Sequence, residues 1–316
     1  MRIVLTGASG HIGNNLVRYI EEREDAEIVA LTRRKIGKEL DGTKATQIVG
    51  DLFDEAFLSE HIRAGDTVVH LAGFIDLTDK KKEQTYKVNF DLTKTVVEVC
   101  KKRGVARFIY AGSVDGIYKD KAGKITEPDG YDEQKIEGNY GKSKALAMGL
   151  VLSEIQNNPD FNAAMVIPSA VVGIHDYKPS AVGGVLCGVL RGKAEFGVNG
   201  GYNFVGVKDV CAGVYALIKN DARGQYILSG ENVTVKELYE IVNRAKGYKR
   251  KPIILPIWLV KLFLPFVKVL SKITLKTLCE PHDYSCEKAK ADLGFSPTPA
   301  KEVILETLAW FEENPI

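Results

Sequence analysis

The sequence predicts a doubly wound α/β fold, in which a parallel sheet carries helices on both faces. Short β-rich runs alternate with helical patterns through the first half of the 316-residue chain. The pattern loosens after residue 173, and apolar residues make up 45% of the chain, enough for a large core. We therefore expect a parallel-sheet domain over residues 1–173, with later strand and helix returns near 203–228, and mainly a smaller C-terminal lobe over 174–316.

The predicted elements of the first half follow one another in the order that this fold requires. Six runs rich in apolar and β-branched residues predict strands at residues 2–7, 27–33, 46–52, 66–73, 107–113 and 162–173. Apolar residues at helical spacing predict helices at residues 12–23, 54–62, 84–103 and 138–157. Sheets of this kind bind ligands at the carboxyl ends of their strands.

The second half returns to strand-then-helix patterns after a glycine-rich stretch. Residues 182–201 are predicted to be mainly loops, and residues 202–219 a strand followed by a helix. A further strand and helix follow at 224–245, where Thr234 and Glu237 form a predicted capping box. Residues 252–270 are strongly apolar, but two lysines and three prolines interrupt them. We expect a buried or interfacial helix there, without integral membrane insertion.

Charge and cysteine content exclude several classes of function. A formal net charge of +2 leaves no basic excess for binding nucleic acid. The five cysteines are scattered, without the spacing of metal ligands or of a disulfide framework. We therefore expect reduced thiols, no metal and a cytoplasmic location.

Three glycines stand three residues apart where the first strand meets the first helix. Gly7 ends the strand, and Gly10 and Gly13 fall at the start of the helix, in the stretch TGASGHIG. Without a Cβ the backbone turns tightly, and a phosphate can approach the N–H groups of the helix N-terminus. The pattern predicts a dinucleotide-binding turn, and a tight turn without a ligand is the alternative.

The second predicted strand ends in LTRRK, where a carboxylate would bind the ribose of NAD. Thr32, Arg33 and Arg34 stand there instead, and guanidinium groups suit a 2′-phosphate. We therefore expect NADP as the cofactor, with NAD less favoured. A solvated basic turn is the alternative interpretation of the two arginines.

Tyr140 and Lys144 stand one helical turn apart in YGKSK, so both side chains lie on one face of a helix. An ammonium close to a phenol lowers the pKa of the phenol, as proton transfer to or from a carbinol oxygen requires. Ser113 ends the preceding strand, and its hydroxyl is placed to hydrogen-bond the same substrate oxygen. We expect these three residues to be catalytic.

The chain resembles the extended short-chain dehydrogenase/reductase family over nearly its whole length. The resemblance rests on TGASGHIG, GDL, HLAG, VNFDLTKTVVEVC, FIYAGSVDGIY, YGKSK, VIPSAVVG, NFVGVKDVCAGV and LGFSPTPAKEVILETLAWF. It implies a Rossmann fold with a substrate-binding lobe. It also implies Tyr140 as acid/base, Lys144 as its partner and nicotinamide-ribose anchor, and Ser113 as the oxygen-orienting hydroxyl.

The resemblance also implies a set of cofactor-binding residues. Asp51 follows the third strand, where the family places an acid beside the adenine. The expected set is Gly7, Ser9, Gly10, His11, Ile12, Gly13, Arg33, Arg34, Asp51, Leu52, Leu71, Ala72, Gly73, Asn89, Tyr140, Lys144 and Pro168. Two positions depart from the family pattern: Gly112 precedes Ser113 where a second serine is usual, and Leu92 replaces a glycine.

Within this family the sequence favours reductases of ketones, such as dihydroflavonol reductases and 3β-hydroxysteroid dehydrogenases. Ile167 and Val172 replace the arginine and tyrosine of RPxxVYGP, a stretch frequent in sugar-nucleotide enzymes. We expect an NADP-dependent oxidoreductase that reduces a ketone or aldehyde, or oxidises the alcohol, on a small molecule with an apolar body. A sugar-nucleotide epimerase or dehydratase, and a non-catalytic NADP-binding sensor, are the alternatives.

The substrate is expected between the loops of 174–203 and the segment 252–286. Residues 175–177 and His282 either face the substrate or belong to ordinary loops, and the sequence leaves both interpretations open. It also leaves a homodimer open as the assembly.

Overall fold

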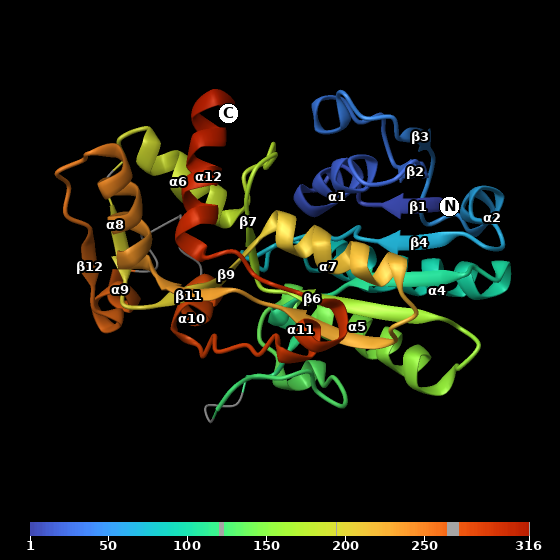
Figure 1. The fold of residues 1–316 in the computed structure, drawn as a ribbon. Coiled ribbons are helices and arrows are strands. Elements are labelled where there is room, and N and C mark those ends of the chain that lie inside the picture. The colour runs from blue at the N-terminus through green and yellow to red at the C-terminus, as the bar shows by residue number, and fades with distance from the viewer. Residues whose placement is uncertain (120–122, 194, 264–271, 316) are drawn as a thin grey trace.

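A seven-stranded parallel sheet forms the centre of the protein (Figure 1). The computed structural model describes residues 1–119, 123–193, 195–263 and 272–315. In spatial order the strands are β10 (Gly224–Leu228), β6 (Ala163–Pro168), β5 (Arg107–Ala111), β4 (Thr67–His70), β1 (Arg2–Thr6), β2 (Glu27–Thr32) and β3 (Thr46–Val49). The strand order reverses between β1 and β4, which opens a crevice at their carboxyl ends. The predicted doubly wound fold is confirmed.

Helices cover both faces of this sheet. One face carries α1 (His11–Glu21), α7 (Val207–Lys219) and α11 (Glu287–Leu293). The other carries α2 (Glu55–His61), α4 (Leu92–Arg103) and α5 (Asn139–Asn157). A helix α3 (Lys82–Tyr86) runs through a π-helical turn into α4. Short 3-10 turns complete this half: η1 (Lys38–Leu40), η3 (Val114–Gly116) and η4 (Glu133–Lys135).

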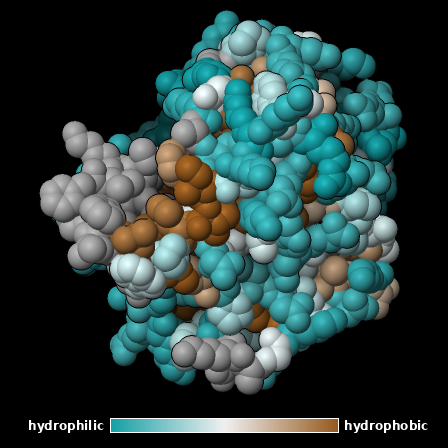
Figure 2. All heavy atoms as spheres, turned by 90° about the vertical axis from the view of Figure 1, so that its left-hand side faces the viewer, coloured by the Kyte–Doolittle hydropathy of each residue, from teal (hydrophilic) through white to brown (hydrophobic). Residues whose placement is uncertain are grey.

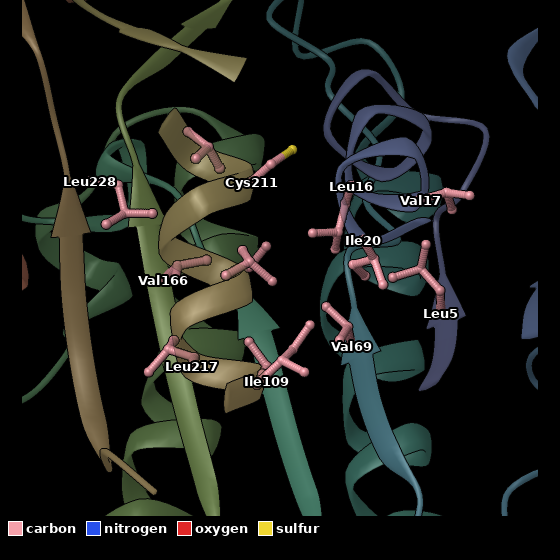
Figure 3. Packing of buried hydrophobic residues seen from close by; sticks show 14 of the residues in the cluster. Leu5, Leu16, Val17, Ile20, Val69, Ile109, Val166, Cys211, Leu217 and Leu228 are labelled. Atoms are coloured by element: carbon pink, nitrogen blue, oxygen red, sulfur yellow. The ribbon is translucent and has the colours of Figure 1, made fainter. Parts of the chain in front are cut away.

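The helical spacing read from the sequence explains how α1 packs. Leu16, Val17 and Ile20 lie on its inner face and approach Leu5 and Val69 of the sheet (Figure 3). All five side chains are fully buried. Burying an aliphatic side chain of this size stabilises the fold by about 1.5–3 kcal/mol. This packing holds the N-terminus of α1 at the carboxyl end of β1.

Segments from the second half of the chain form a smaller lobe at one end of the large sheet (Figure 1). One small sheet has the order β11 (Glu231–Thr234), β9 (Gly201–Gly206), β7 (Ala170–Val172), and the other pairs β12 (Ile253–Leu255) with β8 (Phe196–Val198). The helices of the lobe are α6 (Ala181–Leu190), α8 (Val235–Lys246), α9 (Ile257–Phe263), α10 (Lys272–Cys279) and α12 (Ala300–Glu313).

Three predicted elements were wrong in detail. Residues 182–201, predicted mainly as loops, contain α6, in which Gly183 allows close packing: a Cβ there would lie 2.4 Å from Asp176 Oδ2. The predicted strand 162–173 breaks at Ser169 into β6 and β7, which belong to different sheets. The predicted helix 84–103 contains a π-helical turn at residues 87–91.

Other predictions of local structure are confirmed. The Thr234 hydroxyl accepts a hydrogen bond from Glu237 N, and the Glu237 carboxylate accepts one from Thr234 N, which completes the capping box. The apolar segment 252–270 contains β12 and α9, and its residues 264–270 lie outside the described part of the chain. Within the described residues, no helix has both the length and the apolar content needed to cross a bilayer.

Arg107 joins the segment that contains α7 and β10 to the strands formed by the first half of the chain. It is 3% exposed at the start of β5. Its guanidinium donates to Leu217 O (2.7 Å), to Asn162 Oδ1 and to Ala222 O. Leu217 lies near the end of α7, Asn162 in the loop before β6, and Ala222 just before β10. One cation therefore holds three connecting segments in place.

We expect Arg107→Leu to lower the free energy of unfolding by on the order of 3 kcal/mol, because three acceptors lose a charged donor. Urea titration followed by circular dichroism measures this. Arg63→Leu, a change at an exposed arginine, is the control and should shift stability by less than about 0.5 kcal/mol. Equal stability of both variants would contradict the role assigned to Arg107.

Candidate active site

The glycine turn between β1 and α1 leaves the backbone bare at the crevice. Gly7 has φ +78°, and a Cβ there would lie 2.6 Å from Ala72 N and from Leu71 C. A Cβ on Gly13 would lie 2.2 Å from Gly7 O. The turn therefore needs glycine at both positions. It also brings the predicted residues Gly7, Leu71 and Ala72 into contact.

The N-terminus of α1 has free donors. The first N–H groups of any helix lack an intrahelical partner. The N-cap here is Gly10, which has no side chain to accept from them. Such groups bind phosphate, aided by the helix dipole. Ser9 and Ile12 lie half-buried on either side of Gly10 and His11.

The side chain of His11 contacts the smaller lobe and does not point toward the expected phosphate position. His11 Nε2 lies 2.9 Å from Ile174 O, and burial lowers the pKa of the imidazole. Asn14 Nδ2 donates to His175 O (3.2 Å), and Asn15 Nδ2 donates to Ile174 O (3.0 Å). Sequence reasoning missed these two asparagines, although the mid-helix pair of amides was a signal for a buried polar contact.

The far side of the crevice carries the exposed cations. Arg33 and Arg34 follow β2, which pairs with β1, and both side chains are exposed. Within the described residues neither arginine forms an ion pair. Thr32 Oγ1 is buried and lacks a hydrogen-bond partner in the described part of the chain. Asp51 is exposed after β3, and Leu52 beside it is buried. The glycine cradle, the bare helix end and these groups fit a dinucleotide.

Asn89 ties the end of β4 to α5. Its Oδ1 accepts from Phe74 N (2.7 Å), and its Nδ2 donates to Phe74 O (2.9 Å) and Ser143 Oγ (2.9 Å). A Cβ on Gly73 would lie 3.5 Å from Asn89 Oδ1 and 3.6 Å from Lys144 Nζ. Gly73, Asn89 and Lys144 therefore meet, as the sequence predicts, and Asn89 acts there as a brace.

Tyr140 and Ser113 meet at the carboxyl end of β5. Tyr140 lies in the first turn of α5 with 9% exposure. Ser113 is buried as the N-cap of η3, and its Oγ accepts from Asp115 N (3.2 Å). Pro168 is buried at the end of β6, the strand next to β5. Ser113 and Pro168 thus lie at the carboxyl edge of the sheet, and Tyr140 of α5 lies beside Ser113.

Lys144 is buried beneath Tyr140. Its Nζ donates to Ala111 O (2.9 Å) and to Tyr110 Oη (3.2 Å), and burial lowers the pKa of this lysine to about 8. Beyond Tyr110 lies His70, whose ring nitrogens contact Thr6 Oγ1 (2.7 Å) and Thr93 Oγ1 (3.1 Å). Burial, then the Lys144 charge, lowers the pKa of His70 to about 3. No sequence pattern predicts this buried chain of polar side chains.

The expectation that the pKa of Tyr140 is lowered is wrong when only the side chains of the protein act on it. The pKa of Tyr140 is raised, first by burial and then by the nearby Asp115 carboxylate, while a hydrogen bond with Ser113 lowers it. Lys144 is not among the groups that shift this pKa, and the hydrogen bonds of its ammonium go to Tyr110 and Ala111. Tyr140 is therefore held as a neutral phenol, which is a proton donor.

A pocket of about 880 Å³ opens beside Tyr140. Its walls come from both halves of the chain. Ile117 and Ile136 contribute from the large-sheet half, and Ile257, Ile273 and Leu275 from α9 and α10. The pocket therefore offers an apolar wall next to a phenol.

Ion pairs join the two halves at the pocket. Lys119 Nζ lies 2.9 Å from Glu280 and 3.9 Å from Asp115. Lys276 contacts Glu137 (2.5 Å) and Glu280 (3.6 Å). Burial opposes the charge of Lys119, but Tyr284 and then the carboxylates of Asp115 and Glu280 raise its pKa, and the net shift is upward. Sequence reasoning missed this network, because its members come from distant segments.

The side chains of residues 175–177 make the contacts of an ordinary loop, one of the two interpretations that the sequence left open. His175 Nδ1 lies 3.1 Å from Asn15 Oδ1, and its ring and that of Tyr177 pack against Trp310 of α12. Asp176 is buried and accepts from Ser180 N (2.8 Å). His282 packs near Tyr202 and Tyr284, and its Nε2 has no partner within the described residues.

Known proteins resemble this chain over almost its whole length. It is 24% identical to sterol demethylase protein B of Methylococcus capsulatus, with 99% of each chain covered. It is 27% identical to a putative dihydroflavonol 4-reductase of Synechocystis, over 98% of this chain and 94% of that protein. The mouse sterol-4-alpha-carboxylate 3-dehydrogenase, decarboxylating, is 25% identical over 96% and 89%.

Solved structures share the fold. The crystal structure of gox2253 aligns with a TM-score of 0.87 at 26% identity, covering 99% of this chain and 98% of that one. The dTDP-glucose 4,6-dehydratase DesIV of Streptomyces venezuelae, solved with NAD, aligns with a TM-score of 0.82 at 18% identity over 99% and 98%. Residues 3–229 match the profile of the NAD dependent epimerase/dehydratase family. Because this match spans the glycine turn, β5 and α5, and most of the chain, the protein belongs to that family.

Proposed function

We propose that this protein is an NADP-dependent oxidoreductase that interconverts a ketone or aldehyde and its alcohol on a small molecule with an apolar body. One observation carries the proposal: Tyr140, a buried neutral phenol beside Ser113, lines a pocket in which isoleucine and leucine form part of the wall. Relatives named as a dihydroflavonol 4-reductase and a sterol-4-alpha-carboxylate 3-dehydrogenase support it. The lobe after residue 173 then serves mainly to bind substrate.

The side chains divide the work of carbonyl reduction. A bound nicotinamide cofactor supplies the hydride. Tyr140 Oη donates its proton to the carbonyl oxygen and takes it back in the reverse direction, while the Ser113 hydroxyl holds the same oxygen. Lys144 has three N–H donors, of which Ala111 and Tyr110 take two. The third is available to the ribose or to the phenolate formed on Tyr140.

A sugar-nucleotide epimerase or dehydratase is the second candidate, and one observation favours it. Four lysines, Lys119, Lys135, Lys272 and Lys276, line the pocket and would attract a diphosphate. Lys119 and Lys276 are already paired with carboxylates, so the apolar carbonyl substrate is preferred. A screen of ketones, aldehydes and nucleotide sugars for NADPH oxidation distinguishes the two. The five free thiols support a cytoplasmic location.

Arg33 and Arg34 should select NADP. A charge-assisted contact to phosphate contributes about 1.5–3 kcal/mol, so NADPH should bind roughly tenfold to a hundredfold more tightly than NADH. Arg33→Ala should remove most of this gap, and Arg63→Ala should leave it unchanged. Calorimetric titration with both cofactors measures the affinities, and equal affinities in the wild type would refute NADP selection.

Tyr140→Phe should lower kcat by about 10²–10⁴, because it removes the transferable proton and keeps the ring. The affinity for NADPH should change little. Tyr19→Phe, on α1 where the ring packs against Tyr215 of α7, is the matched control and should keep full turnover. Steady-state kinetics with a substrate from the screen test this, and near-normal turnover of Tyr140→Phe would withdraw the catalytic assignment and favour a binding-only protein.

Lys144→Met should abolish most activity and yet raise the melting temperature near pH 7. The pKa of about 8 lies below the usual lysine value of about 10.4, so the folded protein binds this proton less tightly than the unfolded chain. The charge therefore destabilises the fold fully below pH 8, and this penalty fades as pH rises from about 8 to 10.4.

Thermal unfolding of wild type and variant across this pH range measures the difference. The gain from Lys144→Met should shrink with rising pH. Lys142→Met, two residues away on the same helix and half-buried, should show no such trend. A gain in melting temperature that does not change with pH would mean that burial of the Lys144 ammonium does not destabilise the fold.

A further inference from the structure

One end of the smaller lobe exposes large apolar side chains. Phe196 is 55% exposed, Ile253 49% and Trp258 69%. Phe196 and Ile253 are direct partners in the pairing of β8 with β12, and Trp258 follows on α9. Figure 2 shows hydrophobic side chains gathered on this face of the molecule. We call Phe196, Ile253 and Trp258 the apolar patch.

Cations border the apolar patch. The loops that lead into β8 and β12 carry the basic rim, which consists of Arg191, Lys193, Lys249, Arg250 and Lys251, all exposed. Arg250 Nη1 donates to Val189 O (3.3 Å), and a Cβ on Gly192 would lie 3.5 Å from Arg250 Nη2, so the two loops touch. Glu195 is the acidic residue of these loops, and it is buried, where Asn243 Nδ2 donates to it (2.6 Å). The rim is strongly positive in a chain of net charge +2.

The chemistry of the surface decides between occupants. A two-fold interface joins the same surface of both copies. Two copies that met through this face would therefore bring two positively charged rims together. Lysine is also depleted in protein interfaces. Exposed tryptophan and phenylalanine flanked by lysine and arginine are typical of surfaces that lie in the headgroup region of a bilayer with anionic lipids.

We propose that this end of the lobe docks on an anionic lipid bilayer, with the apolar patch entering the acyl boundary and the basic rim contacting lipid headgroups. The protein lies on the membrane and does not span it. Ile257, which lines the pocket, is the residue before Trp258, so docking sets the pocket wall close to the bilayer. Delivery of an apolar substrate from the membrane rests on the proposed function, whereas docking itself does not.

Vesicle binding tests the proposal without any assay of activity. The purified full chain is mixed with vesicles of phosphatidylcholine alone or of phosphatidylcholine with phosphatidylglycerol. We expect sedimentation with the anionic vesicles only, weakened by salt. The two tryptophans add a second readout, because Trp258 is exposed and Trp310 is 8% exposed. Emission should shift to the blue on docking, and Trp258→Phe should remove the shift.

Variants separate the two parts of the surface. Lys249→Glu with Lys251→Glu should weaken vesicle binding by at least about tenfold, since each cation near such a surface contributes about fivefold. Lys44→Glu with Lys94→Glu makes the same charge change at exposed positions on β3's side of the sheet and on α4, and should have little effect. Phe196→Ser with Trp258→Ser should also weaken binding by about tenfold or more. Circular dichroism confirms that all variants are folded.

Four results would overturn the proposal. They are no binding to either vesicle, equal binding to both, an equal loss in the control pair, and a dimer by light scattering that Phe196→Ser with Trp258→Ser dissociates. The last result would assign the apolar patch to a protein interface. Failure of docking would leave the Tyr140→Phe result untouched, so the two proposals fail separately.

Discussion

Lys144 carries its side chain into the interior of the protein, and the surrounding elements are arranged to accept it. β5 supplies Ala111 O and Tyr110 Oη as hydrogen-bond acceptors. The loop after β4 lies beside it, because a Cβ on Gly73 would be in van der Waals contact with Nζ, at 3.6 Å. Burial of an ammonium with so few partners is expensive, and its pKa falls to about 8 as a result. The ammonium lies near the carboxyl ends of β4 and β5, beside α5.

The same crevice couples the two halves of the chain. The helix that offers bare N–H groups at Gly10 also sends His11, Asn14 and Asn15 to the backbone of residues 174 and 175. Two ion pairs at the pocket, Lys119 with Glu280 and Lys276 with Glu137, make a second connection. The position of the lobe relative to the large sheet is therefore fixed by polar contacts both at the glycine turn and at the pocket.

Local patterns predicted most of the large sheet, because strand and helix periodicity and the glycine turn are encoded in neighbouring residues. They failed where distant packing decides. Gly183, Gly184 and Gly188 suggested a loop, yet α6 forms there: Ser180 caps it by accepting from Gly183 N, and Gly183 packs closely against Asp176. The break at Ser169 was hidden by continuous β propensity on both sides. The Tyr140 pKa was predicted in the wrong direction, because spacing along a helix shows neither burial nor the approach of Asp115.

The titration of Lys144 itself tests the account most directly. Lysine labelled with ¹³C at Cε gives a resonance for each side chain, and the spectrum of Lys144→Met identifies the one that belongs to Lys144. The account predicts that this resonance titrates with a pKa near 8, apart from the surface lysines. A pKa at the usual lysine value of about 10.4 would contradict it, because the ammonium would then be solvated and no buried charge would organise the site.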